Sequence, residues 1–236
     1  MDNPMAPIEL FRLGPVIINQ VVVVTWVVMG AIVLFALWVR LHLRRDKPGR
    51  AQQVAEGLLD WLRQEVRAIV DRPPEPFVPL VGSLFLFIFV SNLSSQVSPF
   101  AGPNVMPPTA DINTTAALAT VVFLAVPVYG VLLTGTLNYL KTYLQPVWIM
   151  LPFNVMSEVS RTVALAVRLF GNILSAEILI GVLLAIVPFF LPVPLMFLGL
   201  ITGTIQAYIF AALSIVYIGG AIKMVEQRGQ KKEESA

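Results

Sequence analysis

The sequence contains no cysteine and a single histidine, His42. Without cysteine the chain has no disulfide, no thiolate nucleophile and no cysteine ligand for a metal. One histidine cannot form the histidine clusters that hold metal ions in proteins. The sequence therefore predicts no metal site and no cofactor.

Charged residues are also scarce, at 13% of the chain, against about 25% in an average soluble domain. Hydrophobic residues make up 57%, and the mean hydropathy is +0.80. This composition excludes a water-soluble fold and predicts an all-α integral membrane protein, with residues 1–236 as a single domain in the lipid bilayer. The net charge of +2 is small, and the basic residues lie near predicted membrane boundaries. That pattern is typical of orientation signals, so we expect no nucleic-acid partner.

Long apolar runs predict about five membrane helices, since about 20 apolar residues cross a bilayer. The predicted spans are residues 16–39, 80–96, 113–136, 152–187 and 195–224. The first is too long for a signal-peptide core of about 7 to 15 residues, so we expect it to be retained. The last two exceed what a bilayer of about 30 Å requires and predict a long, strongly tilted hairpin.

Residues 51–70 show a different pattern, with apolar residues at helical spacing and polar residues on the other faces. Such a segment is typical of an amphipathic helix that lies flat in the cytoplasmic interface of the membrane. Four prolines separate this helix from the next predicted span.

Basic residues indicate which side of the membrane each end of a span occupies. They follow the first, third and last spans, at Arg40, His42, Arg44, Arg45, Lys47, Arg50, Lys141, Lys223, Arg228, Lys231 and Lys232. Residues 98–113 contain no lysine or arginine. By the positive-inside tendency the N-terminus is predicted outside and the C-terminus in the cytoplasm.

Polar and charged side chains interrupt the apolar run 152–187, where they are difficult to accommodate. They are Glu158, Arg161, Arg168, Asn172 and Glu177. A charge at the bilayer centre costs between about 2.5 and 17 kcal/mol, depending on the method. Arg168 cannot escape this penalty by losing its proton, because a guanidinium stays charged in proteins. It must face water, a protein cavity or a counter-charge, which predicts a part in an ion pathway.

Helical geometry places Arg168 and Glu177 on about opposite sides of this helix, because they are nine residues apart. Asn172 lies about 40° from the Arg168 stripe. One helix can thus present a fixed cation to one neighbour and a titratable carboxyl to another. Other interpretations remain open. In the first, Arg168 snorkels to an interface, and in the second, Glu177 is an ordinary helix-end residue. In the third, Glu158 and Arg161 form an interfacial pair without a transport role.

The final span carries small residues at four-residue spacing, Gly199 and Gly203, which predict close packing of two membrane helices. Gln206 shares their face and is expected to hydrogen-bond a guanidinium across that contact. The alternative is that Gln206 joins helices with no part in transport.

Several short segments together form a specific pattern. They are Pro108–Thr115, Leu151–Asn154, Arg168–Asn172, Glu177 and Gln206–Phe210. This pattern resembles subunit a of rotary F-type ATP synthases, closely over about residues 108–219 and in layout only before them. The resemblance implies a bacterial inner-membrane stator that holds two half-channels against a ring of c subunits, beside peripheral stalk b subunits. The implied activity is ion conduction coupled to ring rotation and to ATP synthesis or hydrolysis.

The resemblance also assigns roles to individual residues. It places Arg168 opposite the ring carboxylate, Gln206 as its partner, and Asn172 and Glu177 in the ion path. Asp111 is implied at the outer access, and we add Glu158 to the candidates for ion translocation. The chain has no G-x-x-x-x-G-K-[ST] motif, so we expect it to bind no nucleotide and to catalyse no bond change by itself.

The moving ion is left open by the sequence. Position 199 is glycine, as in plastid-type chains, whereas some bacterial relatives carry a histidine there, so a histidine-dependent proton relay is not predicted. The short chain also resembles the N-type variant thought to move sodium. A self-contained secondary transporter and a non-conducting scaffold are the competing classes. The first usually shows two related halves, and the second has no use for a buried charge.

Overall fold

The computed structural model describes residues 9–13, 16–43, 49–70, 72–101, 106–136, 151–186 and 192–233. In chain order the elements are β1 (Glu9–Leu13), β2 (Val16–Asn19), α1 (Gln20–Leu41), α2 (Arg50–Ile69), α3 (Val78–Ala101), the 3₁₀ turn η1 (Pro108–Ala110), α4 (Ile112–Thr134), α6 (Leu151–Ile186) and α7 (Pro192–Glu233). Among these residues, five helices are long and apolar enough to cross a membrane. The predicted all-α integral membrane class is confirmed.

The first span begins later than the sequence predicted, at Gln20 instead of residue 16. Residues 16–19 form β2, which pairs antiparallel with β1 in a short hairpin that the sequence analysis missed. The β-branched run at Val16–Ile18 favours extended backbone. Similar residues at Val21–Val24 are helical, because in hydrocarbon only a helix satisfies its own backbone groups within a single segment.

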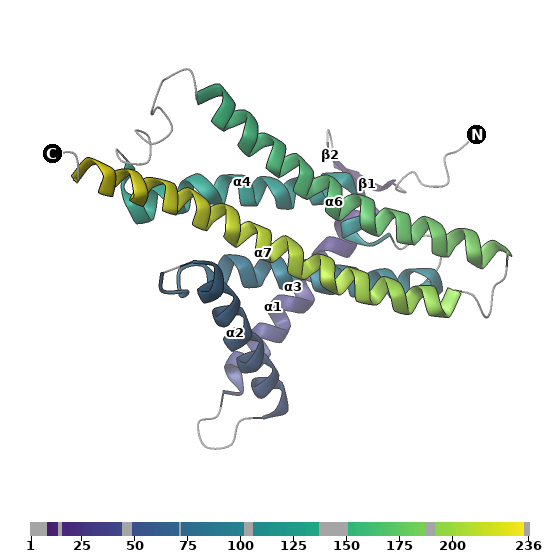
Figure 1. The fold of residues 1–236 in the computed structure, drawn as a ribbon. Helices are drawn as coiled ribbons and strands as arrows, with labels where there is room; N and C mark the ends of the chain where they lie inside the picture. The colour runs from purple at the N-terminus through teal and green to yellow at the C-terminus, as the bar shows by residue number, and fades with distance from the viewer. Residues whose placement is uncertain are drawn as a thin grey trace.

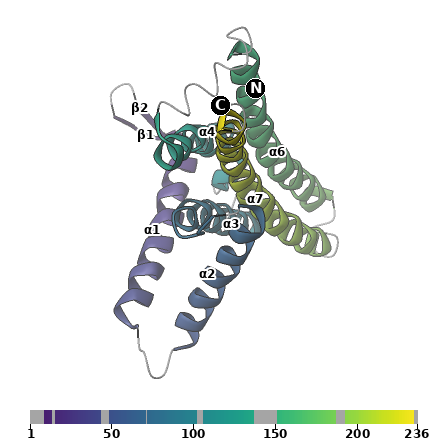
Figure 2. The ribbon, with the colours of Figure 1, turned by 60° about the vertical axis from the view of Figure 1, so that its left-hand side comes forward.

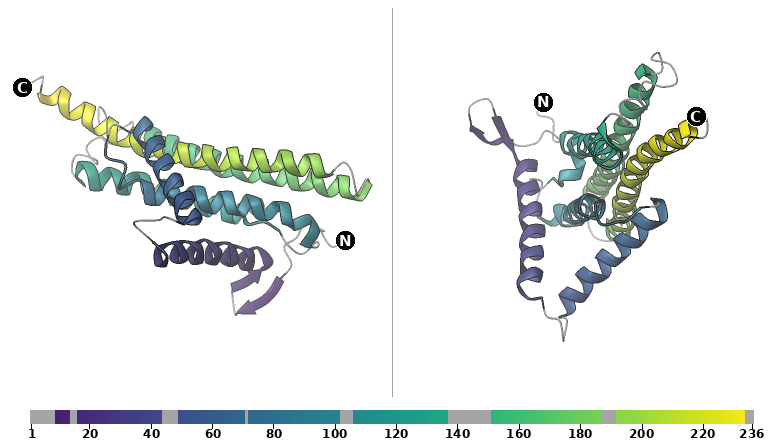
Figure 3. Two further views of the ribbon diagram at one scale, coloured as in Figure 1. Left: turned by 90° about the horizontal axis from the view of Figure 1, so that it is seen from below. Right: turned by 90° about the vertical axis from the view of Figure 1, so that its left-hand side faces the viewer.

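Helices α3, α4, α6 and α7 form the main body of the molecule (Figure 1). Helix α7 contacts α3, α4 and α6. Helices α6 and α7 lie close together where α6 ends and α7 begins, and they diverge toward the start of α6 (Figure 1 and Figure 3). Helices α1 and α2 extend together to one side of this body (Figure 2). The buried core draws on α2, α3, α4, α6 and α7, with Phe77, Ile88, Leu165 and Phe210 fully enclosed.

Helix α2 is the amphipathic helix predicted at residues 51–70, and the second half of its apolar side is covered by protein, while Val54 is exposed. Leu62 and Val66 are buried, and the Trp61 ring lies 5.3 Å from that of Phe85 on α3. Tyr208 on α7 adds a hydroxyl that donates to Glu65 Oε2 at 3.0 Å. This contact anchors α2 to the final helix.

Helix α7 also passes very close to the end of α2. A Cβ atom at Gly219 would lie 2.8 Å from Cγ2 of Val70. Real side chains do not tolerate this distance. Glycine at this position therefore sets how closely the two segments pack.

We expect Gly219→Ala to lower the free energy of unfolding by about 1–3 kcal/mol, as overpacked cores do. The thermal midpoint of the purified protein in detergent measures the loss. Val70→Ala in the same chain removes the clash and is expected to restore most of the lost free energy of unfolding. Gly220→Ala is the matched control, since nothing lies within 4 Å of a Cβ there. Equal midpoints for the Gly219 and Gly220 variants would contradict the packing argument.

Candidate functional site

Arg168 lies at the middle of α6, as the eighteenth of its 36 residues. Its side chain is exposed, and the neighbouring Val163 and Val167 are each 54% exposed. In the parts of the chain that the structure describes, no acidic side chain forms an ion pair with it. The chain's own helices therefore leave a permanent cation on an uncovered apolar face. A charge in such a place must meet water, a protein cavity or a counter-charge.

Glu177 points away from Arg168, toward the interior. Its carboxyl group is half-buried and interacts with the hydroxyl of Ser95 on α3. The Oε1 atom is buried and has no hydrogen-bond partner among the described residues. Asn172, between the two charges, is half-buried. The helix thus presents its cation outward and its carboxyl inward, toward α3.

Polar side chains of α3 fill the space beside the two glycines of α7. Asn92 Nδ2 donates to the carbonyl oxygen of Gly203 at 2.8 Å, and Thr109 Oγ1 donates to Asn92 Oδ1 at 2.8 Å. A Cβ at Gly203 would lie 3.1 Å from Asn92 Cβ, and one at Gly199 would lie 3.3 Å from Gln96 Nε2. Small residues here make room for amides of α3.

These α3 residues were not predicted from the sequence to belong to the site. A signal was present, because the second span ends in a cluster of polar residues with four-residue spacing, at Ser91, Asn92, Ser95 and Gln96. Residues four apart share one face of a helix. The spacing of Gly199 and Gly203 predicts close helix packing and does not indicate the polar side chains that lie against them.

The expected hydrogen bond between Gln206 and Arg168 is absent from the described residues. Gln206 is 5% exposed, so its side chain is enclosed by the protein. Arg168 faces outward instead. The structure shows no contact between these two side chains among the described residues, so the partnership that the resemblance implies stays a prediction.

Two other candidates have local roles. The Arg161 guanidinium lies 5.7 Å from the centre of the Tyr217 ring on α7, a cation–π contact that ties α6 to α7. Its charge also acts on the half-buried Glu158. Asp111 caps α4, since its Oδ1 accepts from the backbone N–H of Asn113 at 2.6 Å. Capping alone explains an aspartate at this position.

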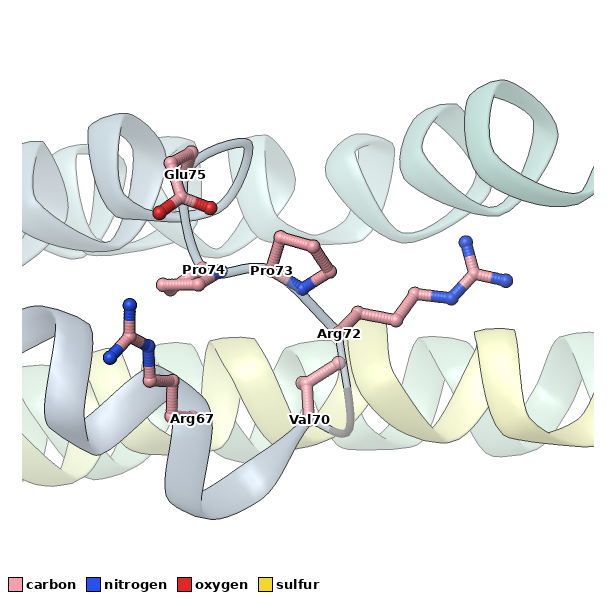
Figure 4. Close-up of a pocket in the computed structure, with 6 residues that line it drawn as sticks. All are labelled: Arg67, Val70, Arg72, Pro73, Pro74 and Glu75. Carbon is pink, nitrogen blue, oxygen red and sulfur yellow. The ribbon is translucent and has the colours of Figure 1, made fainter.

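A pocket of about 500 Å³ lies elsewhere, at the connection between α2 and α3. It is lined by Arg67, Val70, Arg72, Pro73, Pro74 and Glu75. Figure 4 shows the guanidinium groups of Arg67 and Arg72 pointing in different directions, and Arg72 donates to the carbonyl of Leu133 at 3.4 Å. The polar groups do not converge on one ligand position, so this pocket is separate from the site above.

Comparison with known proteins identifies the family. The family model for the ATP synthase A chain matches residues 22–219. The chain belongs to the ATP synthase subunit a family. It is 44% identical to ATP synthase subunit a 2 of Acaryochloris marina over 218 residues, which cover 92% of this chain and 91% of that protein.

Two further relatives are similar over nearly their whole length. Identity is 47% over 214 residues with ATP synthase subunit a 2 of Picosynechococcus sp., covering 90% of both chains. It is 41% over 224 residues with ATP synthase subunit a 2 of Bradyrhizobium sp., covering 95% of this chain and 98% of that one. The resemblance seen in the sequence is therefore confirmed. As a subunit a, the chain is a multi-pass protein of the membrane sector, CF(0), which serves ion transport and ATP synthesis.

Proposed function

We propose that this subunit a conducts protons as the stator of the membrane sector, through two half-channels that it forms against the c-ring. Proton flow would turn the ring and drive ATP synthesis, or run in reverse during hydrolysis. The supporting observation is the exposed guanidinium at the midpoint of α6, on a face that this chain leaves uncovered. A carboxylate carried by a neighbouring ring subunit would supply the counter-charge.

The physical basis is electrostatic. A permanent cation favours the ionised form of a passing carboxylic acid and so releases its proton. The same charge repels cations that would leak directly from one half-channel to the other. Each elementary charge that crosses 100 mV releases about 2.3 kcal/mol, which is available for rotation.

In this proposal Glu177 is the relay of the outer half-channel, and Gln206, Asn172, Glu158 and Asp111 are further candidates for the ion path. The N-terminus lies outside and the C-terminus in the cytoplasm of a bacterial inner membrane. Peripheral stalk b subunits hold the chain against rotation. Nucleotides are bound by other subunits, so the chain itself is not an enzyme.

A cross-linking experiment tests which face meets the ring. The chain has no cysteine, so Val167→Cys places a single thiol one residue from Arg168. In the assembled complex, a photocrosslinker on that thiol is expected to form an adduct with the small ring subunit. Val33→Cys on α1 is the matched control, because both valines are 54% exposed. An adduct with lipid alone at position 167 would remove the support for a ring-facing surface.

A further inference from the structure

Four residues of α3 form a buried polar face, Ser91, Asn92, Ser95 and Gln96, which we call the α3 polar face. Ser91 is 0% exposed, Asn92 4% and Ser95 5%, and Gln96 is half-buried. The α3 polar face points inward, and most other residues of this helix are apolar. Burying polar groups in this way is unfavourable unless they are hydrogen-bonded.

Several atoms on and beside this face lack a protein partner. They are Ser91 Oγ, Gln96 Oε1, Glu177 Oε1 and Gln206 Nε2, none of which is hydrogen-bonded to another described residue. Three helices contribute them, α3, α6 and α7. Each unsatisfied group in hydrocarbon is costly, and buried polar groups without protein partners are usually satisfied by water.

These atoms also lie at different positions along the helix axes. Gln96 lies beside Gly199 and Asn92 beside Gly203, so α3 and α7 are antiparallel at this contact. Gln206 is nearly one turn further along α7 than Gly203. The unpartnered groups are therefore spread along the helices, which suits a file of water molecules better than a single bound one.

Gln96 has a particular position in this arrangement. Its amide occupies the space that a side chain at position 199 would need, since a Cβ there would lie 3.3 Å from Nε2. The adjacent residue, Ser95, interacts with Glu177. One turn of α3 thus directs an amide to α7 and a hydroxyl to the carboxyl of α6.

We propose that Gln96 is a positioning residue of the ion path: with Ser91, its amide holds the water that carries the ion to and from Glu177. This inference rests on the proposed function, and it assigns to α3 a role in shaping that path. Glycine at position 199 suits this arrangement, because a Cβ there would lie 3.3 Å from Nε2 and would require the amide to shift by a few tenths of an ångström.

The test replaces Gln96 in the assembled complex and varies the ion concentration on one side of the vesicle membrane at a time. Gln96→Leu keeps the volume and removes the hydrogen bonds. We expect it to raise the outer concentration for half-maximal ATP synthesis about tenfold, the effect of one lost hydrogen-bonding group. The inner half-maximal concentration is expected to stay unchanged, which a merely structural defect would not produce.

Two variants serve as controls. Gln96→Asn retains an amide and is expected to stay close to the native value. Ser94→Ala removes a neighbouring hydroxyl that is already bonded to the Ser91 carbonyl oxygen at 2.7 Å, and is expected to have no effect. An unchanged outer value in an assembled Gln96→Leu complex overturns the proposal.

A second measurement decides the matter if Gln96→Leu prevents assembly. Gln96→Cys introduces the only thiol of the chain, which is expected to react with a membrane-impermeant thiol reagent added from outside. Ile88→Cys, at a fully enclosed apolar position of the same helix, is expected to remain unlabelled. An unreactive thiol at position 96 overturns the inference. If Arg168 variants still lose coupling in that case, the proposed function stands.

Discussion

Replacing Arg168 by alanine in the assembled complex should reduce ion-driven ATP synthesis in vesicles by at least about a thousandfold. At an effective dielectric constant of about 20, two charges 4 Å apart attract by about 4 kcal/mol, which corresponds to that factor. Without the cation, nothing on the face of α6 favours release of the ring's proton, and nothing blocks a direct leak. We therefore expect loss of synthesis together with passive proton leakage through the membrane sector.

Arg161→Ala is the matched control for this experiment. Arg161 is an exposed arginine of the same helix, seven residues earlier, and its guanidinium lies on the Tyr217 ring. Its removal should weaken the contact between α6 and α7 and leave coupling largely intact. Repeating the measurement with sodium in place of proton gradients identifies the ion. Normal coupled synthesis by the Arg168→Ala complex would rule out the proposed electrostatic role of Arg168.

The positions of the long helices and of Arg168 could be predicted because each rests on a local rule. Runs of apolar residues must be helical in hydrocarbon, and a charge that cannot be lost must avoid lipid. Spacing along a helix also gave the opposite directions of Arg168 and Glu177. None of these inferences required knowledge of which helices touch.

The contacts between helices could not be predicted in the same way. Gly199 and Gly203 predict close packing of α7 against another helix. Only the structure shows that the amides of α3 lie against them. Gln206 is buried, and its pairing with Arg168 stays a prediction. The N-terminal hairpin was not predicted, because the residues of β2, Val16–Asn19, adjoin the first apolar span and were counted as part of it.

Glu177→Gln should have the second-largest effect, a loss of about a hundredfold in the rate of ATP synthesis. A side chain positioned to transfer protons contributes about 10²–10⁴-fold, and glutamine keeps the size of glutamate but has no carboxyl group to gain or lose a proton. The position of Glu177 favours this role, since its Oε1 is buried and unpartnered within the described structure and the Ser95 hydroxyl acts on its carboxyl group.

Glu158→Gln provides the comparison, because Glu158 is also half-buried on α6 and lies near its other end. It is expected to reduce the rate much less if it serves mainly as the neighbour of Arg161. Glu177→Asp, which retains a shorter carboxyl, should recover part of the rate lost by glutamine. The informative quantity is the ratio of the ATP synthesis rates of the Glu177→Gln and Glu158→Gln complexes. Equal rates would mean that the buried carboxyl beside the α3 polar face does not relay the ion, whatever the role of Arg168.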